Sequence, residues 1–172
     1  IHMERTSTAP IVKHLKVIKD CGRKAEGCFP DVYIKRLNGV NDRNIERLTR
    51  YHKIILADGT LVALSGAENG IVGNSGVSIE IWADVNGKRP PNTLGKDVFM
   101  FSVANDKFVP YGFETSGGYD ITSGDMINIC SPFFNGDGAS RGYKCTAWAL
   151  YNENLDYLYC DDLNWETKTK CK

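Results

Sequence analysis

The sequence has no excess of charge of either sign and no long apolar run. Its 21 Lys and Arg residues balance 21 Asp and Glu residues over 172 positions, and they form no basic block. Because nucleic acids are bound through clustered positive charge, we predict no nucleic-acid partner. The longest apolar runs, such as residues 54–57, fall far short of the roughly 20 residues that span a membrane. The chain as given is therefore expected to be soluble.

Catalytic motifs are equally scarce. The sequence contains no HExxH zinc motif, no GxSxG nucleophile motif and no glycine-rich phosphate loop. Of its three histidines, His2 lies in a segment typical of a cloning remnant, which leaves His14 and His52 for acid–base chemistry. We expect surface or packing roles for both. The sequence therefore predicts that the protein is not an enzyme.

Cysteine, in contrast, is abundant. Six cysteines are an even number, and their spacings match neither zinc ribbons nor redox CxxC motifs, so we predict disulfides and an oxidising compartment. Six cysteines allow 15 pairings, and the spacing does not choose among them. Pairing between neighbours would close three short loops. The cysteines are Cys21, Cys28, Cys130, Cys145, Cys160 and Cys171.

The length of the chain predicts one domain with a substantial core. We assign residues 4–172 to it and regard residues 1–3, Ile-His-Met, as the cloning remnant. No signal peptide is present, although the cysteines are typical of an exported protein. We therefore expect the natural N-terminus, and whatever directed export or anchored the protein, to be missing from this chain.

Short runs of β-branched and aromatic residues predict an antiparallel sheet. The predicted strands are residues 53–57, 60–64, 78–83, 98–103 and 108–111, the first two joined by a tight turn at Asp-Gly. The predicted strands do not alternate with helices, so the sequence does not suggest a parallel sheet. Residues 143–158 combine helix-favouring and strand-favouring side chains, so their type stays open. The end of the chain, residues 160–171, is predicted to be a stapled hairpin or turn.

A short amphipathic helix is predicted at the start of the chain. Ile11, Val12, Leu15 and Ile18 follow helical spacing after Pro10, which suits a first helical position. We expect the apolar face of this helix to pack on the sheet. The predicted fold class is therefore α+β: an N-terminal amphipathic helix packed on an antiparallel β-sheet, with a disulfide-stapled C-terminal region.

The loop between the predicted strands 78–83 and 98–103 is the sharpest candidate site. Asp84, Asn86 and Asp97 offer the hard oxygen ligands that calcium prefers. A helix-loop-helix calcium motif is excluded, because Gly95 stands where that motif requires a glutamate. The alternative is structural: Asp84 and Asn86 stabilise a turn through hydrogen bonds to the backbone, and Asp97 ends the loop. Calcium is thus a possible cofactor.

Aromatic side chains provide a second kind of candidate. Three tryptophans and eight tyrosines are enough to build a carbohydrate-binding or protein-binding face if several are exposed, although such residues more often fill a core. Trp82 lies in a central predicted strand, where we expect it to be buried. Trp165 lies in the C-terminal stapled turn and is the better candidate for an exposed binding residue.

Several segments together resemble a known family. They read IKDCGRKAEGCF, ILADGT, DVNGKRPPNTLGKDVFMF, FVPYG, GYKCTAWALYNENLDYLYC and LNWETKTKC, and span most of the chain from Cys21 onward. Their order resembles the globular domains of prepilin-type proteins, the bacterial type IV pilins and type II secretion pseudopilins. Some pseudopilins bind calcium in a loop of the sheet region.

The resemblance implies a structural role. In that family an apolar N-terminal helix, processed at a cleavage and methylation motif, inserts into the inner membrane and assembles subunits into a filament. It implies that residues 8–18 are the C-terminal half of that helix, that other pilin or pseudopilin subunits are the partners, and that the domain lies in the periplasm or in an extracellular pilus. The alternative is a secreted glycan-binding or protein-binding module.

Overall fold

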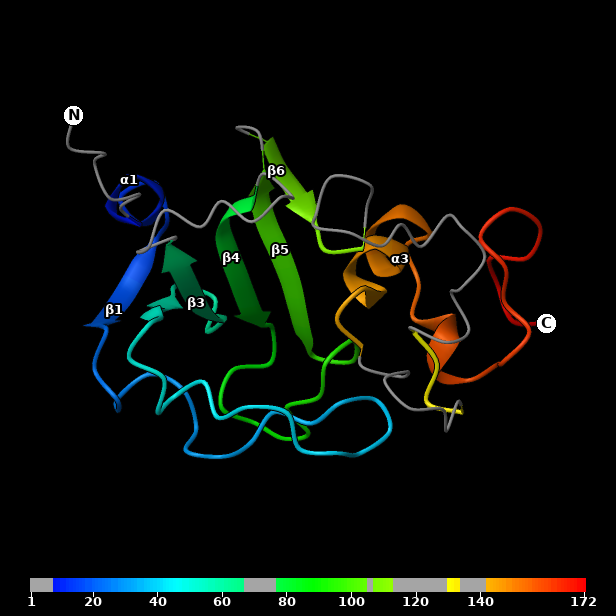
Figure 1. Cartoon of the computed structure of the whole chain (residues 1–172), viewed down its shortest axis with the longest axis horizontal. Helices are drawn as coiled ribbons and strands as arrows, with labels where there is room; N and C mark the ends of the chain where they lie inside the picture. The colour runs from blue at the N-terminus through cyan, green and yellow to red at the C-terminus, as the bar shows by residue number, and fades with distance from the viewer. Residues whose placement is uncertain (1–7, 67–76, 105–106, 113–129, 134–141) are drawn as a thin grey trace.

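The computed structural model describes residues 8–66, 77–104, 107–112, 130–133 and 142–172. These residues form a six-stranded sheet with a small helical region beside it (Figure 1). The elements are α1 (Ala9–Val12), β1 (Val17–Gly22), β2 (His52–Leu56), β3 (Leu61–Gly66), β4 (Val77–Asp84), β5 (Val98–Ala104), β6 (Lys107–Pro110), α3 (Cys145–Tyr151) and the 3-10 helix η2 (Asp156–Leu158).

The sheet is a meander in which each strand pairs antiparallel with the next, in the order β1-β2-β3-β4-β5-β6. All five predicted strands are confirmed to within two residues at each end. The turn between β2 and β3 is the predicted Asp-Gly turn: Gly59 has a φ of 89°, and Asp58 Oδ1 accepts a hydrogen bond from the Thr60 amide at 2.9 Å. This tight turn makes β2 and β3 neighbours in the sheet.

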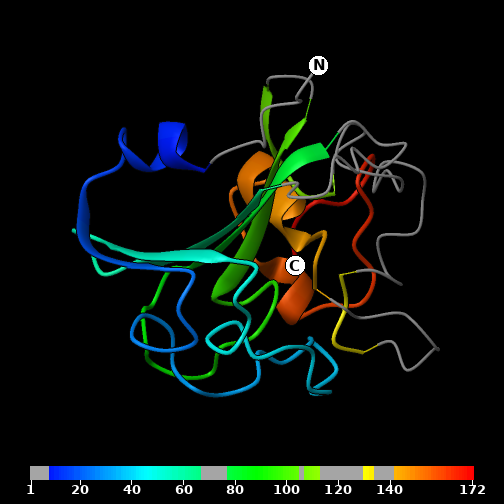
Figure 2. The same cartoon turned by 60° about the vertical axis from the view of Figure 1, so that its left-hand side comes forward.

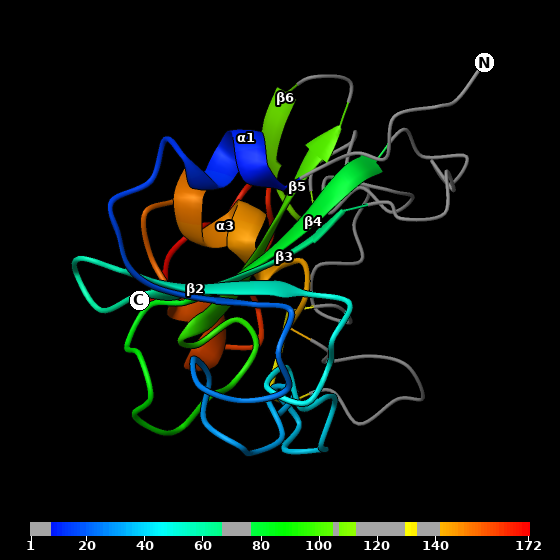
Figure 3. The ribbon, with the colours of Figure 1, turned by 90° about the vertical axis from the view of Figure 1, so that its left-hand side faces the viewer.

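The prediction of an N-terminal amphipathic helix packed on the sheet is wrong. Helix α1 has only four residues, and residues 17–22 form the edge strand β1 (Figure 3). Val17 and Ile18 are β-branched, and pairing with β2 satisfies the backbone of this segment, which outweighs the helical spacing of its apolar residues. Ile18, assigned by that spacing to the buried face, is 67% exposed. Among the described residues no helix is long and apolar enough to cross a membrane.

The two faces of the sheet belong to different apolar clusters. On β3, Leu61 and Ala63 belong to one cluster and Val62 and Leu64 to another, because successive side chains of a strand point to opposite faces. The larger cluster, which contains the fully buried Trp82, is completed by the irregular segment 23–51 (Figure 2). The smaller one consists of Ile54, Val62, Leu64, Ile79 and Ile81, with Ile11, Val12 and Leu15 packed against it.

A charged and aromatic network fastens segment 23–51 to the sheet. The Arg43 guanidinium lies 4.6 Å from the ring centroid of Trp82 and donates a hydrogen bond to the Tyr51 hydroxyl at 3.0 Å. Tyr51 in turn donates to Glu80 on β4 at 2.8 Å, and Arg43 pairs with Asp42 at 2.9 Å. These contacts satisfy partly buried polar groups and stack the cation on the aromatic core.

The cysteines form three disulfides between neighbours, which confirms the prediction of disulfide bonds. The bonds are Cys21–Cys28, Cys130–Cys145 and Cys160–Cys171. The segment whose type the sequence left open contains α3 and η2. The predicted C-terminal hairpin or turn is also confirmed, because Asn164 and Lys168 exchange two backbone hydrogen bonds inside the last disulfide loop.

Candidate functional site

The loop of residues 84–97, which we call the acidic loop, brings its two carboxylates to the same end of the sheet. Asp84 is the last residue of β4 and pairs with Val98, the first residue of β5, so Asp84 and Asp97 lie close together. The Val85 amide donates to the Asp97 carbonyl at 2.9 Å and closes the loop. Asp84 is 1% exposed and Asp97 is 5% exposed. Two acidic side chains are thus buried side by side, which requires compensation.

Asp97 receives that compensation from the loop itself. Its Oδ1 accepts a hydrogen bond from the Thr93 amide, and its Oδ2 accepts from the Asn92 amide at 2.9 Å and from Asn86 Nδ2 at 2.8 Å. This is the hydrogen-bonded loop structure that the structural alternative describes. It organises the loop around the Asp97 carboxylate.

Asp84 is poorly compensated by comparison. Burial raises the pKa of its carboxyl to about 7, and the negative charge of Asp97 adds to the increase. Backbone hydrogen bonds from Asn86, at 3.3 Å, and from Gly87 oppose the shift but do not cancel it. A bound cation would remove the cause of this shift, because it would favour the ionised carboxylate.

Two amide oxygens of the acidic loop are also without compensation. Asn86 Oδ1 and Asn92 Oδ1 are buried and accept no hydrogen bond from the described residues. Asn92 is 6% exposed, so loss of water at its oxygen is nearly complete. Buried oxygens without a donor are rare in native structures and often indicate an ion or a water molecule.

Together these groups form an oxygen-only donor set. Two carboxylates and two amide oxygens suit calcium, which takes six to eight oxygen ligands from carboxylates, amides, backbone carbonyls and water. No group of three or more His, Cys, Asp or Glu side chains lies together in the described ranges, so the amides are essential to any metal site here. The residues present supply ligand atoms of the type that calcium prefers. The structure brings together all three predicted ligands, Asp84, Asn86 and Asp97.

Asn92 is the site residue that the sequence did not single out. It follows two prolines, and asparagine is common in turns; its φ of 51° agrees with a turn position. The signal that distinguishes it is burial of its side chain, which depends on how the acidic loop folds back against Lys35. A single polar residue in a turn carries no sequence mark of such burial.

The acidic loop is held from the C-terminal side. The Tyr157 hydroxyl donates to the Gly95 carbonyl, and burial raises the pKa of Tyr157. A Cβ atom on Gly95 would lie 2.9 Å from Cys145 Cβ, so only glycine allows this approach. The Cys130–Cys145 disulfide therefore lies against the acidic loop.

Trp165 lies away from these residues, in the C-terminal region. Its ring packs edge-to-face with Trp148 and with Tyr151, at centroid distances of 5.4 and 6.1 Å. Trp165 is partly buried, whereas Tyr151 is 54% exposed. Tyr151 and Trp165 therefore form a partly exposed aromatic surface.

His52 joins a hydroxyl to a carboxylate. Its Nδ1 lies 3.0 Å from Thr8 Oγ1 and its Nε2 lies 2.8 Å from Asp20 Oδ1. The sequence of groups resembles a hydroxyl–histidine–carboxylate relay, but Thr8 is 4% exposed and its hydroxyl faces away from solvent. We interpret these bonds as a tie between α1 and the β1–β2 edge.

Comparison with protein-family models, with curated proteins and with solved structures finds no match for this chain. Its function is therefore argued from the residues and their arrangement.

Proposed function

We propose that this chain is the globular domain of a pilin-like or pseudopilin filament subunit, which acts by assembly and contact and catalyses no reaction. The resemblance of its segments to prepilin-type proteins supports this proposal, and the three disulfides are typical of an exported domain. Other subunits of the same filament are the partners. The inner membrane is contacted by a helix that precedes this domain.

The observation that carries the proposal is the apolar surface at both outer strands. In the described part of the chain β1 and β6 are the outer strands of the sheet, and each carries a large exposed apolar side chain. Ile18 on β1 is 67% exposed and Phe108 on β6 is 62% exposed. Outer strands with apolar side chains favour contact with another chain, and isolated domains commonly protect them.

The proposal does not include the expected continuation of an assembly helix through residues 8–18. Helix α1 has four residues, and residues 17–22 form β1. The full-length precursor is expected to contain a prepilin peptidase site followed by an apolar helix of roughly 20 residues ahead of residue 4. The sequence of the complete gene tests this directly, and a precursor without such a helix would contradict the proposal.

We further propose that the acidic loop binds calcium through oxygens of Asp84, Asn86, Asn92 and Asp97. The ion would supply positive charge between two buried carboxylates and partners for two buried amide oxygens. Its role is to stabilise the loop that joins the two central strands. Millimolar calcium is expected to raise the melting temperature of the domain, and a chelator to reverse the increase. An unchanged melting temperature would contradict calcium binding.

A second candidate function is recognition of a glycan or protein by the aromatic surface. The specific observation is the Tyr151–Trp165 pair, because partly exposed aromatic rings provide large rigid contacts. In this case the isolated domain is expected to bind an oligosaccharide library, and Trp165→Ala to abolish binding. A filament subunit that acts only by assembly would show no such affinity.

A further inference from the structure

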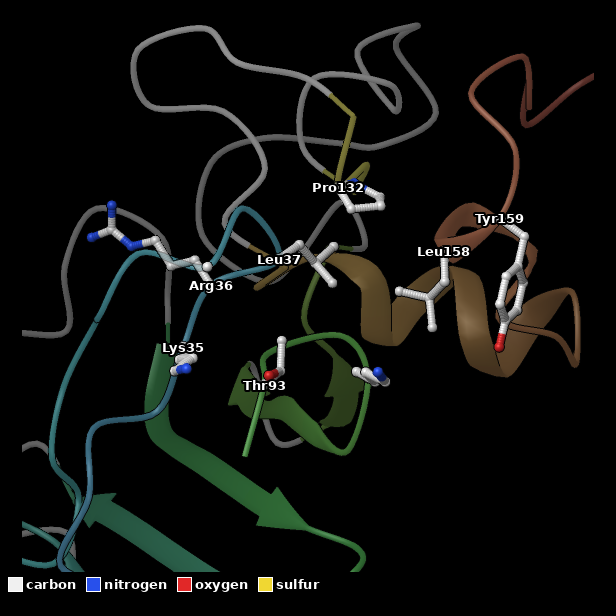
Figure 4. A pocket seen from close by; sticks show the side chains of 9 residues that line it. Lys35, Arg36, Leu37, Thr93, Pro132, Leu158 and Tyr159 are labelled. Carbon is white, nitrogen blue, oxygen red and sulfur yellow. The ribbon is translucent and has the colours of Figure 1, made fainter. Parts of the chain in front are cut away.

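A pocket of about 270 Å³ lies between the acidic loop and the C-terminal region (Figure 4). Its volume is near the lower end of the ~300–1,000 Å³ of small-molecule sites, so it suits one or two side chains of a partner. The lining residues are Lys35, Arg36, Leu37, Gly39, Thr93, Lys96, Pro132, Leu158 and Tyr159.

The base of the pocket has a fixed backbone. The Lys35 amide donates to the Asn92 carbonyl and the Leu94 amide donates to the Lys35 carbonyl, both at 2.9 Å. Lys35 and Thr93 thereby form a short parallel bridge between segment 23–51 and the acidic loop. This pairing fixes the separation of the two backbone segments, which favours a preformed site.

Among the described residues, the charged side chains that line the pocket are all positive. Lys35, Arg36 and Lys96 contribute cations, and no carboxylate is among the described lining residues. Arg36 is paired with Asp42 at 3.0 Å, and its guanidinium points away from Leu37 and Pro132 in Figure 4. The ammonium groups of Lys35 and Lys96 have no partner among the described residues, and both residues are exposed. They are available to an anion.

The remaining wall is apolar. Leu37, Pro132 and Leu158 lie around the opening, and the ring of Tyr159 extends beside Leu158 (Figure 4). Tyr159 is 76% exposed, the highest value for a large apolar side chain among the described residues. An exposed ring next to an apolar wall loses unfavourable hydration when a partner covers it.

We propose that this pocket binds an acidic peptide segment of another protein. A carboxylate of that segment pairs with Lys35 and Lys96, and an adjacent apolar side chain packs against Leu158 and Tyr159. Lysine also binds phosphate, but only as a point charge, whereas guanidinium forks and backbone amides give a phosphate site its directed hydrogen bonds. Here Arg36 is occupied by Asp42, and the amides of Lys35 and Lys96 already donate to carbonyls. The inference goes beyond filament assembly, since the isolated domain would bind the peptide whether or not it polymerises.

The test measures peptide binding by isothermal titration calorimetry at low salt. The probe is an acetylated, amidated tripeptide with glutamate between two leucines, and its match contains glutamine in place of glutamate. The acidic peptide is expected to bind more tightly by up to about 25-fold. Because exposed ion pairs contribute up to about 1 kcal/mol each, loss of either lysine weakens binding up to about fivefold, and 0.2 M salt weakens it further.

The matched variants are Lys35→Ala with Lys96→Ala, and, as the control, Lys13→Ala with Lys16→Ala near α1. Of the two double variants, only Lys35→Ala with Lys96→Ala is expected to weaken binding of the acidic peptide. Tyr159→Ala is expected to weaken binding of both peptides equally. Equal affinity for the two peptides, or equal losses in the pocket and control pairs, would overturn the proposal. Binding of millimolar inorganic phosphate with no binding of either peptide would also overturn the proposal and would identify a phosphate site.

Discussion

The charge of the Asp84 carboxyl opposes folding when no cation is bound. Its pKa is raised from 3.8 to about 7, so between these values the folded protein holds a proton that the unfolded chain releases. The contribution of Asp84 to stability therefore falls as the pH rises from about 4 to about 7, and then stays constant. Calcium has the opposite dependence, because it competes with that proton and binds more tightly as the pH rises through about 7.

Asp84→Asn removes the titrating charge from the acidic loop. We predict that the melting temperature of the variant, relative to the unaltered protein in chelator, rises from about pH 4 to about pH 7 and then stays constant up to pH 8. The variant is also expected to lose the response to calcium. Thermal denaturation at one-unit pH intervals measures both effects, with Asp161→Asn at an exposed carboxylate as the control. A pH-independent difference between variant and parent would contradict the assigned titration.

The buried oxygen of Asn92 is tested separately from its backbone conformation. Glycine adopts a φ near 51° without strain, so Asn92→Gly preserves the turn and deletes only the side chain. We predict that the calcium Kd rises about tenfold, the equivalent of one lost polar interaction of about 1.4 kcal/mol. Calorimetric titration with calcium measures the change. An unaltered Kd would mean that Asn92 is not a ligand.

The acidic loop packs closely against the first residue of α3. Gly95→Ala would place a Cβ 2.9 Å from Cys145 Sγ, whereas Gly59→Ala places a Cβ in open space at a similarly positive φ. Both variants are strained by their backbone, but only the first also has a steric clash. We predict that Gly95→Ala is less stable than Gly59→Ala by about 1–3 kcal/mol in urea unfolding. Equal losses would show that the loop is not packed against α3.

The sequence predicted the central strands better than it predicted the N-terminal segment. The sheet follows from local signals, because Asp58 and Gly59 determine a turn and the flanking apolar runs determine its strands. The helix prediction failed at residues 17–22. Ile18 fits the helical spacing of Ile11 and Leu15, but it lies in β1, which pairs with β2, far away in the sequence. Long-range pairing is not encoded in the periodicity of one segment.

The candidate site was predictable in the same partial way. Asp84, Asn86 and Asp97 are conspicuous because acidic and turn-forming residues cluster in one loop. Asn92 and the pocket lysines Lys35 and Lys96 are not, because their importance comes from burial and from the contact between segment 23–51 and the acidic loop. Such proximity results from tertiary structure.

Across the whole molecule, buried hydrogen bonds join the sheet to the C-terminal region. The Met100 amide of β5 donates to the Thr146 hydroxyl of α3, and the Tyr157 hydroxyl donates to the Gly95 carbonyl of the acidic loop. Exposed large apolar side chains lie on the outer strands β1 and β6, and also in segment 23–51, in the acidic loop, on α3 and in the C-terminal region. This distribution suits a subunit whose function is contact with other chains.

The most direct test of the proposed assembly is photo-crosslinking of the protein in the cells that produce it. A benzophenone amino acid replaces Ile18, Phe108 or, as the control, the exposed Asp161. The account predicts adducts at multiples of the subunit mass from positions 18 and 108, and few from position 161. Monomers alone at positions 18 and 108, in cells where the protein is abundant, would contradict assembly through the outer strands.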